Sequence, residues 1–100
     1  MSITSNESDD GKVVTIQVNG RFDFSAHQEF MQAYKAHPKG EKRFVVDLQK
    51  TEYLDSSAMG MLLQLRDYGD KSSQIEIVNG NDAVQEILRI ANFDKLFKVA

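Results

Sequence analysis

The chain has 100 residues, of which 41% are hydrophobic and 27% charged, and it carries a formal net charge of −3. It contains no cysteine, which excludes disulfides, a thiolate nucleophile and a cysteine-based zinc site. The basic residues are scattered rather than gathered into the stripe that nucleic-acid binding needs, and no apolar stretch approaches the ~20 residues of a membrane span.

These properties predict one domain over residues 1–100, because a chain of this length buries roughly 60–65% of the surface that its unfolded form exposes. No signal peptide is apparent, since residues 1–10 lack a basic start followed by an apolar run. We therefore expect a cytoplasmic monomer that binds neither nucleic acid nor membranes and whose partner is a protein or a small ligand.

The first predicted elements are two strands joined by a tight turn. Residues 1–9 are polar apart from Met1 and Ile3 and predict a frayed edge strand. The Asp-Gly pair at 10–11 is a hairpin turn signal. Apolar residues alternate with polar ones over 14–18, which predicts a strand with one buried face.

A helix and a central strand follow. Ser25 and Gln28 have the spacing of a capping box, which predicts that a helix begins there and runs until Pro38 stops it. The nearly continuous apolar run at 43–48 is typical of a central strand that is covered on both faces. We expect the next residues, 49–55, to cross the edge of the sheet.

The remaining elements alternate between helix and strand. Ser56 or Ser57 is expected to cap a second helix that ends near residue 68. Residues 74–78 predict another strand, and the apolar spacing over 84–91 predicts a third helix followed by an apolar tail.

This order of elements predicts an α/β fold. Strands that alternate with helices favour a mostly parallel sheet with right-handed crossovers, and the opening hairpin adds an antiparallel edge. We expect a mixed sheet of about four to five strands flanked by three to four helices.

The second predicted helix has two apolar faces. At ~100° per residue, one side of the helix is apolar and should face the sheet. Met59 and Leu63, four residues apart, form a separate sector with Arg66. This sector is either a docking patch for a partner or a surface that a neighbouring helix covers, and the helix pattern alone does not separate the two.

Two serines stand in tandem at the start of this helix, and only one of them can be the N-cap. The other hydroxyl is then free at an exposed turn. A phosphate on it would add about −1.5 to −2 charges, which the positive end of a helix tolerates. A partner docked across Met59 and Leu63 would not tolerate that charge, so the pattern is consistent with a binding switch as well as with a plain helix cap.

Enzymatic chemistry is not indicated, and we expect no metal or cofactor. A nucleophilic serine needs a base, but nothing in the sequence links His27 or His37 to Ser56, and no G-x-S-x-G elbow is present. Asp47 lies late in a central strand, as in a receiver domain, yet residues 19–21 lack the acidic pair that holds Mg²⁺ there. We interpret Asp47 as a strand-end residue bonded to the backbone.

Several segments resemble one known family over nearly the whole chain. The most specific is Asp-Ser-Ser at 55–57 after an apolar strand, where the family reads Asp-Ser-Ser or Asp-Ser-Thr followed by Gly-Leu-Gly; Ala58 and Met59 replace that Gly-Leu pair here. The other segments are the turn and strand at 10–18, Gly-Arg-Phe-Asp at 20–23, 45–48, 53–62 and 93–97. Together they resemble the STAS domain of bacterial anti-sigma factor antagonists.

The resemblance assigns roles to individual residues. It implies that Ser56 is the phosphoacceptor and that Ser57 helps to shape the helix start. It also implies that Asp23 and Asp55 flank the phosphoacceptor. The expected partner-binding residues are Phe24 and the three residues of the helix sector described above, Met59, Leu63 and Arg66.

The resemblance also implies a pathway. In the family, the unphosphorylated protein binds an anti-sigma factor, often a serine kinase, and so frees a sigma factor; a PP2C-type phosphatase restores this form. The compact length is similar to single-domain members that tune biofilm, motility or exopolysaccharide output. In these, one regulator can combine kinase or phosphatase modules with a receiver domain.

Two further functions remain open. One is a module that senses a nucleotide or another small ligand without a sigma-factor partner, although no P-loop or Gly-rich phosphate cradle is present and Asn-Gly-Asn at 79–81 is typical of a turn. The other is a purely structural adaptor in which Ser56 serves only as a cap.

Overall fold

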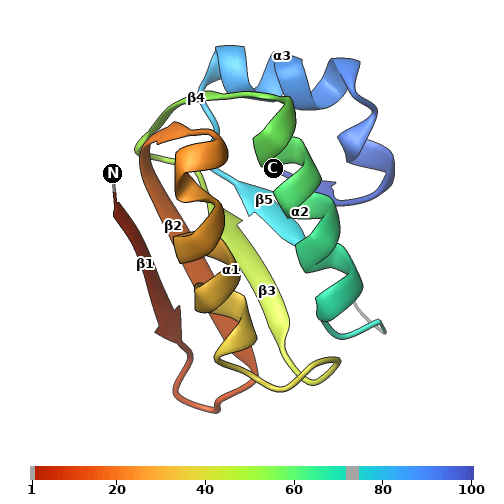
Figure 1. The fold of residues 1–100 in the computed structure, drawn as a ribbon. Coiled ribbons are helices and arrows are strands. Elements are labelled where there is room, and N and C mark those ends of the chain that lie inside the picture. The colour runs from red at the N-terminus through yellow and green to blue at the C-terminus, as the bar shows by residue number, and fades with distance from the viewer. Residues whose placement is uncertain (1, 72–74) are drawn as a thin grey trace.

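The computed structural model describes residues 2–71 and 75–100. In this part of the chain, six strands form one mixed sheet that is accompanied by three α-helices and two 3₁₀ helices (Figure 1). The predicted α/β fold is confirmed, with one or two more strands than expected. The elements are β1 (Ser2–Glu7), β2 (Val13–Phe22), η1 (Phe24–Ala26), α1 (His27–Lys35), β3 (Arg43–Asp47), β4 (Thr51–Leu54), α2 (Ser56–Tyr68), β5 (Glu76–Val78), α3 (Asp82–Ile90), η2 (Phe93–Lys95) and β6 (Lys98–Val99).

β2 pairs with three other strands of the sheet, β1, β3 and β4. The strand order is β1-β2-β3-β5-β6, with β1 antiparallel to β2 and the other pairs parallel. β4 lies off this path and pairs in parallel with the C-terminal end of β2, after a shift in register between Gly20 and Arg21. The first part of β2 therefore pairs with β3 and its last part with β4.

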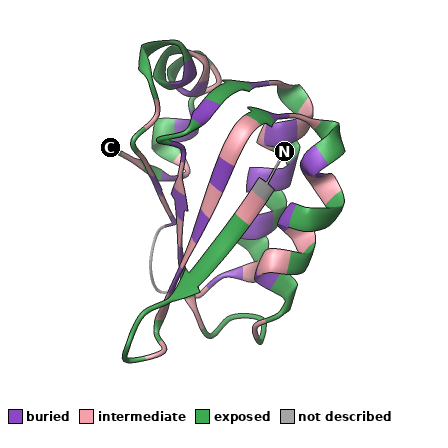
Figure 2. Ribbon diagram, turned by 90° about the vertical axis from the view of Figure 1, so that its left-hand side faces the viewer, coloured by how far each residue is buried: buried purple, intermediate pink, exposed green. Residues whose placement is uncertain are grey.

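The core lies between one face of the sheet and helices α1 and α2 (Figures 1 and 2). Every second residue of β2 points into it, as the alternation predicted. Apolar side chains from α1 and α2 meet them, and the predicted core side of α2 is correct. The buried residues of these elements are Val14, Ile16, Val18, Phe22, Phe30, Tyr34, Phe44, Val46, Ala58, Met61, Leu62 and Leu65.

The prediction that the central strand is covered on both faces is wrong. In β3, Phe44 and Val46 are buried, but Val45 is only half-buried. Its neighbours across the sheet are Thr15 on β2 and Glu76 on β5, so this face is bordered by polar residues. The strand alternates between a buried face and a half-exposed face like any strand that is covered on one side. It looks continuously apolar because the residue on the half-exposed face, Val45, is also apolar.

Two strands escaped the sequence pattern. Residues expected to cross the sheet edge form β4, whose ends Thr51 and Leu54 are buried, and the Thr51 hydroxyl donates a hydrogen bond to the Val18 carbonyl at 2.7 Å. β6 spans only two residues of the apolar tail. Of the strand expected at 74–78, β5 covers the last three residues, and Gln74 lies outside the described residues.

The first helix also begins differently from the prediction. Ser25 is not an N-cap: it lies inside η1, and its backbone N–H donates to Asp23, which caps that 3₁₀ turn. α1 then follows without a side-chain cap of its own. None of the helices in the described part of the chain is long and apolar enough to span a bilayer.

Candidate functional site

The candidate site lies where β2 and β4 leave the sheet together. Phe22 and Leu54, a register pair at the ends of these strands, are both buried. The next residue in each chain segment is an aspartate, Asp23 or Asp55. The Asp55 backbone N–H donates to the Phe22 carbonyl at 3.3 Å, which ties the second exit to the first.

Asp55 is the N-cap of α2. Its backbone is extended (φ −116°, ψ −174°), and its Oδ1 accepts hydrogen bonds from the Ala58 N–H at 3.0 Å and from the Ser57 hydroxyl at 2.6 Å. The expectation that Ser56 or Ser57 caps this helix is therefore wrong. An aspartate caps as well as a serine and also brings a negative charge to the positive end of the helix.

This cap distinguishes the two serines. Ser57 is half-buried and its hydroxyl donates to Asp55. Ser56 is the first residue of α2 and is exposed, and among residues 2–71 and 75–100 no hydrogen bond involves its hydroxyl. The helix start therefore leaves the Ser56 hydroxyl available for modification.

Both flanking carboxylates are anionic at neutral pH. The hydrogen bond from the Ser57 hydroxyl is the main cause that lowers the pKa of Asp55 below its ordinary value, and hydrogen bonds from the Ser25 side chain and backbone do the same for Asp23. The charge of Asp23 acts on the Asp55 pKa in the opposite direction, so the two carboxylates lie within electrostatic reach of each other. A charged group on Ser56 would join two existing negative charges.

The expected partner-binding residues fall on two elements. Ser56, Met59 and Leu63 follow one side of α2 at helical spacing. Met59 is half-buried against the core, whereas Leu63 is 39% exposed. Arg66 is exposed and its Nε donates to the Leu96 carbonyl beside η2 at 3.3 Å, so this stripe borders the C-terminal part of the chain.

Phe24 belongs to a different element, η1. It is 70% exposed and stacks on the His27 ring at 5.3 Å between centroids. The structure adds Tyr53, 42% exposed, with the guanidinium of Arg21 4.8 Å above its ring. The sequence reasoning missed this pair because β4 was not recognised; in a strand that buries Leu54, Tyr53 must face outwards.

Other candidate residues have structural roles. The His27 ring stacks on Phe24, and the His37 ring packs edge-on to Phe44. Asp47 accepts hydrogen bonds from the Gln49 N–H at 3.0 Å and from Asn79 Nδ2 at 3.1 Å. In the described part of the chain, no group of three or more His, Cys, Asp or Glu could hold a metal ion.

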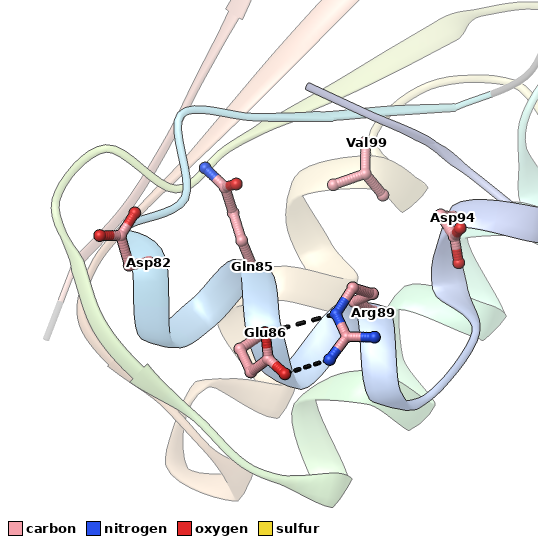
Figure 3. Close-up of a pocket in the computed structure, with 6 residues that line it drawn as sticks. All are labelled: Asp82, Gln85, Glu86, Arg89, Asp94 and Val99. Atoms are coloured by element: carbon pink, nitrogen blue, oxygen red, sulfur yellow. Dashed lines mark hydrogen bonds and ion pairs between the residues drawn. The ribbon is translucent and has the colours of Figure 1, made fainter.

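A hollow of about 400 Å³ is formed by α3, η2 and β6, and Ser56 belongs to none of them (Figure 3). Three carboxylates face it, and its one guanidinium, on Arg89, pairs with Glu86. A nucleotide phosphate would meet mainly like charges there, so the hollow does not favour nucleotide binding. Its lining residues are Asp82, Gln85, Glu86, Arg89, Asp94 and Val99.

Comparisons with known proteins identify the family. The model "Mlab, STAS domain" matches residues 5–99. The STAS-domain containing protein PA14_20770 of Pseudomonas aeruginosa (strain UCBPP-PA14) is 50% identical over 101 residues, covering 100% of both chains.

Solved structures agree on the fold. An anti-sigma factor antagonist from Mycobacterium paratuberculosis superposes with a TM-score of 0.75 at 22% identity, covering 98% of this chain and 85% of that one. The phosphorylated form of the Bacillus cell fate determinant SpoIIAA gives a TM-score of 0.65 at 14% identity, covering 99% and 91%. The chain belongs to the STAS domain family.

Proposed function

We propose that this STAS domain is an anti-sigma factor antagonist whose binding is switched by phosphorylation of Ser56. The unphosphorylated protein, a cytoplasmic monomer, binds an anti-sigma factor that is also a serine kinase and so frees a sigma factor. A PP2C-type phosphatase or a receiver-linked regulator removes the phosphate. The output controlled in this way is biofilm, motility or exopolysaccharide production.

One observation carries the proposal: the cap of α2 uses Asp55 and Ser57 and leaves Ser56 exposed. Phosphorylation of Ser56 therefore breaks no hydrogen bond of the cap. The N-terminus of α2 favours the added charge, since unpaired N–H groups and the helix dipole meet anions there. The fold should survive a modification that changes the surface strongly.

The surface beside Ser56 explains why a partner would be sensitive to that change. A partner that covers Met59, Leu63 and Arg66 must also approach Ser56, which lies on the same side of α2. A phosphate would add about −1.5 to −2 charges next to Asp23 and Asp55. Desolvating that cluster would weaken the complex.

The first test is a comparison of Ser56 variants in binding to the partner that co-purifies from the native cell. We expect Ser56→Ala to bind like the wild type and Ser56→Asp to lose at least about tenfold in affinity, which corresponds to about 1.4 kcal/mol. Ser5→Asp, which adds the same charge at an exposed position of β1, is the matched control. Equal binding by Ser56→Ala and Ser56→Asp would refute the switch.

A second test concerns the docking stripe. Leu63→Ala should weaken the complex while leaving the cooperative thermal unfolding of the domain intact, because Leu63 is exposed. Isothermal titration gives the affinity and circular dichroism gives the melting curve. Loss of cooperative unfolding would mean that Leu63 stabilises the domain rather than a complex.

A further inference from the structure

The pairing of β2 with β4 brings the ends of both strands together just before Ser56, the first residue of α2. Arg21 is opposite Tyr53 in the register, and the next residue of each strand, Phe22 or Leu54, is buried. Side chains alternate along extended backbone, and Asp23 (φ −135°, ψ −169°) and Asp55 (φ −116°, ψ −174°) continue it. Arg21, Asp23, Tyr53 and Asp55 therefore point away from the core, on the side of the chain where α2 begins.

Arg21 is the cation of this cluster. Its Nε lies 3.5 Å from Asp23 Oδ2, and its guanidinium stands 4.8 Å above the Tyr53 ring. Among the ion pairs of the described residues, this is the one that reaches Asp23 or Asp55. The Arg21 side chain is 65% exposed, so water screens the pair and leaves it easy to exchange.

We propose that Arg21 is the internal receptor of the phosphate: on phosphorylation of Ser56, its guanidinium leaves Asp23 and the Tyr53 ring and binds the phosphate oxygens. This rests on the proposed function, which supplies the phosphate. A phosphate carries about twice the charge of a carboxylate and offers three acceptor oxygens. A guanidinium can bind two of them at once, which a single long contact to Asp23 does not match.

The exchange would give the two forms of the protein different surfaces at one place. In the unphosphorylated form, the Arg21 guanidinium lies over the Tyr53 ring and offers a partner a joint cationic and aromatic surface. In the phosphorylated form, this surface is dismantled and Asp23 is left without its cation. A partner would then lose its contacts with Arg21 and Tyr53 in addition to meeting the phosphate.

The test uses phosphoserine inserted at position 56 during translation, so that no kinase or partner is needed. In the unmodified protein, the ring of Tyr53 should shift the NMR signals of the Arg21 side chain upfield, and Tyr53→Leu should abolish that shift. We expect the same signals to move towards their free positions in the phosphoprotein. Upfield signals that stay unchanged on phosphorylation would overturn the proposal.

A ³¹P titration gives an independent measurement. If Arg21 holds the phosphate, its positive charge favours the dianion. The second pKa of the phosphate should therefore be higher by roughly 0.2 to 0.7 in Arg21→Gln than in the parent phosphoprotein. Arg21→Lys should restore part of the difference. The matched control is Lys71→Gln, which removes an exposed cation just beyond the other end of α2. The series is repeated in a His27→Gln background, so that the ionisable ring of His27, which stacks on Phe24, cannot contribute to the titration curve.

An unchanged phosphate pKa in Arg21→Gln would contradict the proposal. The outcome is separate from that of the proposed function, because neither measurement involves the partner. If the phosphoprotein bound the partner as well as the unmodified protein, the switch would be wrong whatever Arg21 does. If binding is switched but Arg21 does not move, only the role of Arg21 is wrong.

Discussion

The protein has two similar turns, side by side, where β2 and β4 leave the sheet. In residues 23–25 and again in 55–57, an aspartate accepts a hydrogen bond from the hydroxyl of the serine two positions later, at 2.5 Å and 2.6 Å. Each aspartate also caps the helix that follows. The two turns differ in their middle residue, which is Phe24 in one and Ser56 in the other, and both are exposed.

This comparison separates the residues of each tripeptide that make the cap from the one that does not. The first and third positions are Asp and Ser in both turns and share the side-chain hydrogen bond, whereas the backbone N–H that the aspartate accepts belongs to Ser25 in one turn and to Ala58 in the other. The middle position has no part in the cap, so it is free to vary: one turn presents an apolar ring, and the other a hydroxyl.

The largest effect should come from truncating one of the two paired side chains that are buried where the strands end. Leu54→Ala leaves a cavity next to Phe22, with which it is paired in the register and buried. We expect a loss of about 2–5 kcal/mol in the free energy of unfolding, measured with urea. Leu63→Ala, at an exposed position, is the control. A loss below about 1 kcal/mol for Leu54→Ala would show that the contact between Leu54 and Phe22 does not stabilise the two turns.

The next effect concerns the two caps. Asp55→Ala should destabilise the domain by about 1 kcal/mol, since it removes the acceptor for two groups at the start of a 13-residue helix. Asp23→Ala should cost less, because η1 has only three residues. Chemical denaturation checks both. Equal losses would mean that helix length does not set the value of the cap.

Acid should weaken the second turn through the same carboxylate. The pKa of Asp55 is lowered in the folded state, mainly by the Ser57 hydroxyl. The ionised cap therefore stabilises the fold above the unfolded value of about 3.9, and this contribution is lost as the pH falls through the folded pKa. The stability difference between the wild type and Asp55→Asn should shrink over that range, and Ser57→Ala should reduce the pH dependence. A constant difference would contradict this.

The smallest effects should distinguish the two serines. Ser57→Ala removes the hydroxyl that donates to Asp55 and should cost up to about 1 kcal/mol. Ser56→Ala should change stability by no more than about 0.5 kcal/mol, because its hydroxyl has no bond in the described structure. Thermal melts of both variants, with Phe24→Ala as the equivalent change in the other turn, test this. A larger loss for Ser56→Ala than for Ser57→Ala would reverse the assignment of their roles.

The sequence predicted those parts of the fold that have a strong period. The alternation in β2 and the core side of α2 were read correctly because each has one clearly apolar face. β4 was missed because its four residues include only one aliphatic residue, Leu54, and its other buried side chain is a threonine bonded to the neighbouring strand. The run around Val45 was wrongly predicted to be covered on both faces because an apolar residue stands on the half-exposed face of β3.

Within the candidate site, the sequence located the turn but not its hydrogen bonds. Asp, Ser and Ser are all good capping residues, so propensity alone does not decide which of 55–57 is the cap. The choice depends on the backbone of β4, which delivers Asp55 in an extended conformation to the start of α2. Arg21 and Tyr53 depend on a pairing between segments 32 residues apart, which no local pattern records.

The branched pairing of β2 has a consequence for how the switch would be observed. Gly20, at φ 88°, marks the point where the strand changes from one partner to the other, and main-chain bonds hold both exits beyond it. Because these bonds join the two segments that carry the aspartates, we expect the backbone to move little when a charge is added. The backbones of the two forms would then superpose closely. The difference between them would lie in side-chain rotamers and surface potential, which methods that follow only the main chain do not detect.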